Sequence, residues 1–105
     1  MIECVHCSEV NSEYEIISPS DFDKVLRVVR DNLRDGTLVE SQYWPEGEIR
    51  TCTVPFDQVS ITGPYQQDIY IYYFHCPECR RLYRLSCDTY HGSGGSWEAL
   101  GIKYQ

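Results

Sequence analysis

The 105-residue chain lacks several features that would place it in a membrane or outside the cell. Its first residues, MIECVHC, hold neither a basic nor an apolar stretch, so we expect no signal peptide. No apolar run approaches the roughly 20 residues that cross a bilayer. Repeats, low-complexity tracts and long linkers are also missing, and the length suits one domain over residues 1–105. Together these absences predict a cytoplasmic, single-domain protein.

Basic charge is scarce as well. Nine lysines and arginines stand against sixteen acidic residues, for a formal charge of −7. Residues 1–57 hold twelve acidic and five basic side chains, whereas residues 58–105 hold four of each. Nucleic acid requires a basic face, so we do not expect it as the main partner. The acidic half is either an ordinary solvated surface or a face that binds a basic protein. For the second case we expect four residues to contact the partner: Glu13, Glu15, Asp21 and Asp23.

One amphipathic helix is indicated after residue 18. Either Ser18 caps it with Pro19 in the first helical position, or Ser20 caps it. The next apolar residues recur at helical spacing, and Gly36 is a suitable end. The apolar stripe consists of Phe22, Val25, Leu26, Val29 and Leu33.

The remaining chain has the composition of β-strands. We expect a hairpin of residues 37–43 and 49–54 around the turn 44–47, and a strand over residues 68–75. Residues 82–90 alternate between apolar and polar, and residues 96–103 form a last strand. One helix on an antiparallel sheet is an α+β fold.

Six cysteines carry the clearest chemical signal. Four of them form two C-x-x-C units, Cys4 to Cys7 and Cys76 to Cys79. Each unit can turn two thiolates toward one ion, and two units complete a tetrahedral site of four sulfurs. Because thiolates are soft ligands and the site would be closed, we expect a structural zinc. A shared metal would also order an N-terminal segment that otherwise frays.

The second unit, CPEC followed by a strand, resembles the knuckle of zinc-ribbon and rubredoxin-type sites. That resemblance implies metal-holding roles for Cys4, Cys7, Cys76 and Cys79. The rubredoxin type would imply iron and electron transfer, but the 68 residues from 8 to 75 between the knuckles make zinc the better match. Such knuckles often carry glycine after the second cysteine, where Ser8 and Arg80 stand here.

Two alternatives remain for the cysteines: a redox pair and unligated thiols. A strand followed by CPEC is similar to thioredoxin-like proteins, but only 26 residues, 80–105, follow Cys79, and the first pair would stay unexplained. His6 and His75 adjoin cysteines and are expected to be neighbours rather than ligands. Cys52 and Cys87 are expected to be small core residues.

Residues 90–97, YHGSGGSW, form a glycine-rich segment that is either a strand connection or a contact for a ligand or partner through His91 and Trp97. No set of residues matches a known catalytic constellation, so we do not expect an enzyme. A small enzyme centred on His91 is the least favoured hypothesis.

The preferred function is a small acidic zinc protein that binds another protein, in the manner of an inhibitor or a toxin-immunity protein. The alternative is a zinc-ribbon accessory factor that contacts nucleic acid through Arg80, Arg81 and Arg84.

Overall fold

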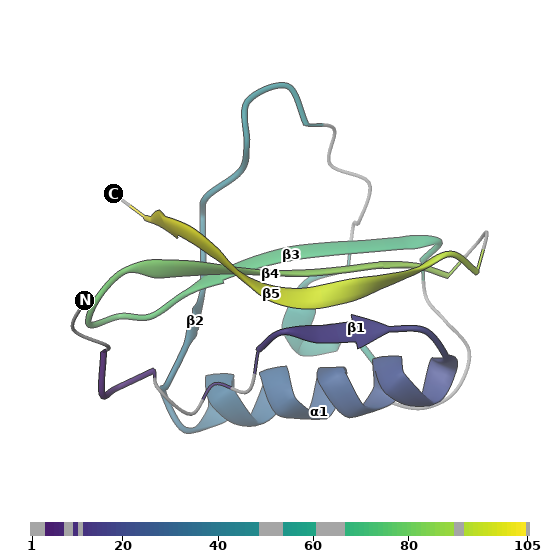
Figure 1. Cartoon of the computed structure of the whole chain (residues 1–105), viewed down its shortest axis with the longest axis horizontal. Helices are drawn as coiled ribbons and strands as arrows, with labels where there is room; N and C mark the ends of the chain where they lie inside the picture. Colours follow the sequence, from purple (N-terminus) through teal and green to yellow (C-terminus); the bar gives the residue numbers. More distant parts are fainter. Residues whose placement is uncertain are drawn as a thin grey trace.

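The computed structural model describes residues 4–7, 10, 12–48, 54–60, 67–89 and 92–104. Within these ranges the chain forms one α-helix, one short 3₁₀ helix and a five-stranded antiparallel sheet, which confirms the α+β prediction. The elements are β1 (Tyr14–Ile16), α1 (Pro19–Arg34), β2 (Val39–Glu40), η1 (Phe56–Gln58), β3 (Ile69–His75), β4 (Arg81–Asp88) and β5 (Gly94–Lys103). Figure 1 shows α1 lying along one face of the sheet.

The strand order is β1-β5-β4-β3-β2. The strands β3, β4 and β5 form an antiparallel meander, in which Tyr72 pairs with Leu85 and Leu85 with Trp97. β1 and β2, which flank α1 in sequence, take the two opposite edges of the sheet. The N-terminal segment, the β3–β4 turn and the end of β5 therefore come to the same end of the sheet (Figure 1).

Local signals in the sequence account for the ends of α1. Ser18 is the N-cap, and its side chain and that of Asp21 form a reciprocal capping box, with Pro19 in the first turn. Gly36, just beyond the helix, has a φ of +84°, which glycine adopts without strain. The predicted stripe faces the sheet: Phe22, Val25, Leu26 and Val29 are buried, and Leu33 is partly buried against the core.

The core lies between α1 and the sheet and is rich in aromatic rings. The ring centroids of Tyr70 in β3 and Phe22 in α1 lie 5.0 Å apart, so Tyr70 faces the helix. Because side chains alternate along a strand, every second residue of β3 from Tyr70 lies on this helix side. Phe74 lies on that side and packs edge-on against Phe56 of η1 and Trp97 of β5. η1 therefore shares the helix side of the sheet.

The opposite side of the sheet carries no helix among the described residues. We call it the open face and define it by outward side chains of four strands: Glu15, Ile69, Ile71, Tyr73, Arg84, Ser86, Asp88, Ser96 and Glu98. Residues 41–48 pass over it (Figure 1), with Tyr43 and Trp44 edge-on to Tyr73 at 5.2 and 5.3 Å.

Two details differ from the sequence-based expectations: the length and partner of β2, and the presence of β1. The strand expected over residues 37–43 shortens to the two residues of β2, which pairs with β3. Residues 49–53, the other arm of the expected hairpin, and Cys52 among them, lie outside the described residues. The turn at 44–47 is present, with Gly47 at a φ of +84° and the Glu48 N–H donating to the Pro45 carbonyl at 3.2 Å. β1 was not predicted, because its three residues are too few for an alternating strand pattern to be recognised.

Candidate metal centre

The two C-x-x-C units meet at one end of the sheet. Cys76 and Cys79 lie in the tight turn between β3 and β4, and Cys4 and Cys7 lie in a turn of the N-terminal segment. The four Sγ atoms lie within 4.8 Å of one another, with Cys4 to Cys76 at 3.9 Å and Cys7 to Cys79 at 3.7 Å. A tetrahedral ion with Zn–S bonds of about 2.3 Å requires sulfurs about 3.8 Å apart. The four predicted ligands therefore lie together, and two of their pairs have the spacing that such an ion needs.

The second knuckle is closed by backbone hydrogen bonds that continue the β3–β4 ladder. The Arg80 N–H donates to the Cys76 carbonyl at 2.9 Å, and the Cys76 N–H donates to the Arg81 carbonyl at 3.0 Å. Arg80 has a φ of +70°, the left-handed conformation that glycine adopts freely. The arginine therefore takes the backbone shape for which the zinc-ribbon knuckles that this turn resembles often use glycine. Ser8, the matching position of the first knuckle, lies outside the described residues.

Backbone N–H groups inside each turn face the first sulfur of that turn. Those of Cys7 and, more weakly, His6 lower the pKa of the Cys4 thiol to about 7, against the effect of its partial burial. Burial raises the pKa of Cys76, while the N–H groups of Cys79 and Glu78 act in the opposite direction. Paired N–H donors of this kind favour thiolates.

Cys7 is a buried ligand, with 6% of its surface exposed, and only Cys76, at 0%, is more protected among the four. Burial raises the pKa of its thiol to about 12. Four adjacent thiols cannot all ionise without a compensating cation, because each thiolate would repel the next. A divalent ion supplies that charge and displaces the thiol protons, so the donor set fits a soft divalent metal.

Neither neighbouring histidine takes part in the cluster. His6 Nε2 lies 3.1 Å from the carbonyl oxygen of Gly36, which ties the first knuckle to the end of α1. His75 stacks on Tyr104, with ring centroids 4.6 Å apart. Among the described residues, the candidate metal group consists of the four cysteines alone, as expected.

A buried asparagine holds the chain that follows the first knuckle. Asn32 Nδ2 donates to the Val10 carbonyl at 2.9 Å, and the Val10 N–H donates to the Cys7 carbonyl at 3.3 Å. The sequence interpretation missed Asn32, although it stands three residues after Val29, where the apolar stripe of α1 continues. A polar residue at such a position signals a buried hydrogen bond.

The four acidic residues chosen as partner contacts do not form one surface. Glu13 Oε1 accepts the Ala99 N–H of β5 at 3.0 Å, and Asp21 caps α1 by accepting the Ile17 and Ser18 N–H groups. Glu15 lies on the open face, and Asp23 lies on α1. Two of the four carboxylates therefore have structural roles within the chain.

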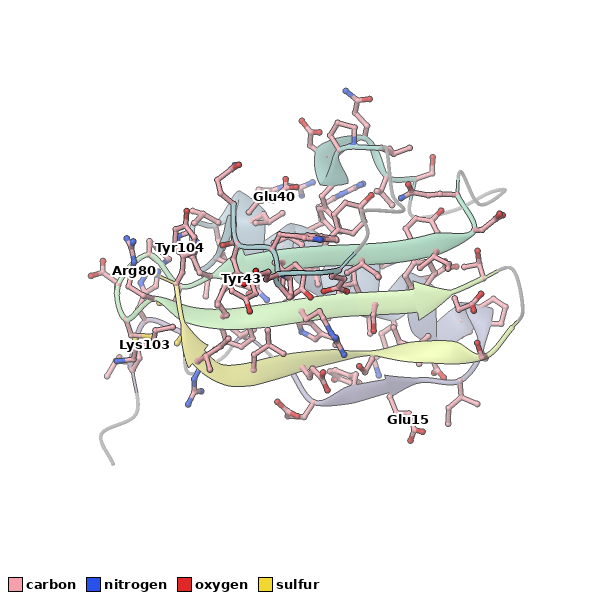
Figure 2. The ribbon with its side chains drawn as sticks, turned by 90° about the horizontal axis from the view of Figure 1, so that it is seen from above. Glu15, Glu40, Tyr43, Arg80, Lys103 and Tyr104 are labelled. Carbon is pink, nitrogen blue, oxygen red and sulfur yellow. The ribbon has the colours of Figure 1, made fainter. Side chains whose placement is uncertain are left out.

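The three arginines of the nucleic-acid alternative have separate contacts. The guanidinium of Arg80 lies 5.3 Å from the ring centre of Tyr104, and Arg84 forms an ion pair with Glu98 at 3.0 Å. Arg81 hydrogen bonds to Tyr83, which raises the pKa of Arg81. Arg80, Lys103 and Tyr104 do gather at the metal end of the sheet (Figure 2).

The glycine-rich segment has a structural explanation in its described part. Gly94 and Gly95 belong to β5, and a Cβ at Gly95 would lie 1.9 Å from the Ser86 carbonyl oxygen. Trp97 is fully buried, so it offers no surface to a partner, and His91 lies outside the described residues. Cys87 is a buried core residue, as predicted, and burial raises the pKa of its thiol to about 11.

Two further observations bear on the class of protein. In the described part of the chain, α1 is too short and too polar to span a bilayer. The chain matches no family model, no curated protein and no solved structure, so the site has to be interpreted from its own geometry.

Proposed function

We propose that this protein is a zinc-stabilised module that binds a basic protein. The observation that carries the metal part is the set of four sulfurs within 4.8 Å of one another, with Cys4 to Cys76 at 3.9 Å and Cys7 to Cys79 at 3.7 Å. Four protein ligands leave the ion no position for water or substrate. The zinc is then structural, and the proposal assigns no reaction to the protein.

Charge supports the second part of the proposal. The formal charge is −7, yet the segment 19–35, which covers α1 and its C-cap, has four acidic and four basic side chains. Three more basic residues, Arg80, Arg81 and Lys103, lie at the metal end, where they offset the thiolates. Most of the other acidic side chains lie outside α1 and outside the two knuckles, although Glu78 lies within the second knuckle. This excess of acid would attract a cationic partner and repel nucleic acid.

We prefer zinc to iron because of the 68-residue insertion between the two knuckles, since a closed site of four sulfurs at this spacing suits either metal. Metal analysis of the purified protein should give about one zinc per chain. Cobalt substitution should produce the charge-transfer bands of four thiolates, and they should survive Cys87→Ser but not Cys76→Ser. Four titratable thiols among the proposed ligands, with no bound metal, would contradict the metal part.

The finer interpretation is an inhibitor or toxin-immunity protein, which rests on the small size and the acidity of the chain. Co-expression of this chain with the product of an adjacent gene tests it directly. We expect rescue of growth by the chain and formation of a complex that salt weakens. A neighbour that is neither toxic nor bound would remove this interpretation and leave the metal site unaffected.

A further inference from the structure

The open face lies on the side of the sheet opposite α1, and it is not an ordinary solvated sheet face. Its central side chains are partly exposed, with 35% for Arg84 and 34% for Glu98. A solvated face usually carries polar residues throughout, but here Ile69 and Ile71 lie half-buried beside them. Figure 2 views this face directly, with α1 behind the strands.

Carboxylates dominate the open face and the loop above it. The face carries Glu15, Asp88 and Glu98, and the loop 41–48 adds Glu46 and Glu48. Arg84 is the single basic side chain of these two segments as the structure describes them. Neither Glu15 nor Glu46 has an ion pair among the described residues. This surface therefore holds four more carboxylates than guanidinium groups.

A row of polar side chains crosses the middle of the open face and is already ordered. The Tyr73 hydroxyl donates to Glu48 Oε2 at 2.9 Å, and Arg84 Nη2 donates to Glu98 Oε1 at 3.0 Å. Tyr73 and Arg84 are cross-strand partners in β3 and β4. Two carboxylates are thus held on either side of one guanidinium, and they need no rearrangement to receive further cations.

Two aromatic rings border this row. Tyr43 and Trp44 are half-buried, and both pack edge-on against the buried ring of Tyr73. Their loop is anchored, because the Ser41 N–H donates to the Tyr73 carbonyl at 2.9 Å and Trp44 Nε1 donates to the Glu48 carbonyl at 2.7 Å. Held aromatic rings beside carboxylates bind the aliphatic stems and charged ends of lysine and arginine.

We infer that the open face, with Tyr43 and Trp44 at its margin, is the surface that binds a lysine- or arginine-rich segment of a partner protein. This inference rests on the proposed function and adds the place and the chemistry of recognition. Stems of the partner's cationic side chains lie on the two rings, and their charges face Glu48, Glu98 and Glu15. A nucleic acid would bring phosphates to these carboxylates, and a second copy would bring carboxylates to carboxylates.

The test uses the zinc-loaded full chain and a short synthetic peptide of alternating lysine and alanine. Resonance shifts in an isotope-labelled sample should cluster on the open face and on loop 41–48. The emission of Trp44 should change, while Trp97, fully buried, should not respond. Trp44→Phe removes that signal and shows its source.

Matched charge reversals make the test specific. The double variant Glu15→Lys with Glu46→Lys should lower the affinity for the peptide about tenfold. The double variant Asp23→Lys with Asp31→Lys on α1 makes the same change in net charge and should alter that affinity less than about twofold. Circular dichroism and zinc content check that both variants are folded.

Equal weakening by the two pairs would overturn the inference, because net charge alone would then explain binding. Shifts confined to α1 or to the metal end, tighter binding of a single-stranded oligonucleotide than of the peptide, or concentration-dependent self-association through this face would overturn it too. Zinc content and growth rescue decide the proposed function separately from these outcomes.

Discussion

The Sγ atoms of Cys7 and Cys79 lie 3.7 Å apart although 72 positions separate them in the chain. This contact joins the N-terminal segment to the β3–β4 turn, and His6 and Asn32 fasten the same segment to α1. The first knuckle therefore depends on long-range contacts, some through the metal site and some through α1.

Removal of zinc should unfold the N-terminal segment first and destabilise the whole protein. At zinc concentrations about a thousandfold above the dissociation constant, metal binding contributes about 4 kcal/mol. Chelation or Cys76→Ser should therefore lower the melting temperature by more than about 10 °C. Cys87→Ser, at a buried cysteine outside the cluster, is the control and should retain its zinc. Equal melting temperatures with and without chelator would show that the metal is not structural.

Arg80 should prefer glycine to alanine if its backbone conformation carries a cost. Its φ is +70°, and both substitutions remove the guanidinium that lies over Tyr104. Only the alanine keeps a Cβ in the left-handed region, so Arg80→Gly should be more stable than Arg80→Ala by about 1 kcal/mol. Urea unfolding of the zinc-loaded variants measures the difference. Equal stability would mean that the turn relaxes to another conformation.

Much of this fold could be predicted because its signals are local. Ser18, Pro19 and Gly36 mark the ends of α1 within a few residues, and each C-x-x-C unit carries its own turn. The roles of Glu13 and Asp21 could not be predicted in that way. Glu13 accepts an N–H from Ala99, 86 positions away, so sequence patterns near it suggest only an exposed charge. The two-residue β2 and three-residue β1 owe their strand form to the neighbours they pair with.

Asn32 should be the polar core residue on which the first knuckle depends. Asn32→Ala leaves the Val10 carbonyl without its donor in a buried place and should cost about 1–3 kcal/mol. It should also speed the transfer of zinc to a colorimetric chelator, because the segment after Cys7 loses its anchor. Asp31→Ala, at the adjacent exposed position, controls for helix propensity and should change neither quantity much.

The capping carboxylate of Asp21 should make stability depend on pH. Its hydrogen bonds to the Ile17 and Ser18 N–H groups lower its pKa. A lowered pKa in the folded state means that the ionised form stabilises the fold above the unfolded pKa of about 3.9, and that this contribution is lost as the pH falls through the folded value. Asp21→Asn should thus melt below the natural protein at neutral pH, and the gap should shrink in acid. A gap that stays constant with pH would assign the effect to something other than the charge.

Gly95 should tolerate substitution less than Gly92, although both belong to the segment that suggested a ligand loop. A Cβ at Gly95 would lie 1.9 Å from the Ser86 carbonyl oxygen and 2.7 Å from the Cys87 Cα, so β4 and β5 would have to separate. Gly92 has open space around it, and its φ of +68° is the main obstacle there. We expect Gly92→Ala to cost about 1 kcal/mol and Gly95→Ala about 3 kcal/mol or more, measured by urea unfolding. A larger loss at Gly92 would mean that the segment matters for more than the pairing of β4 with β5.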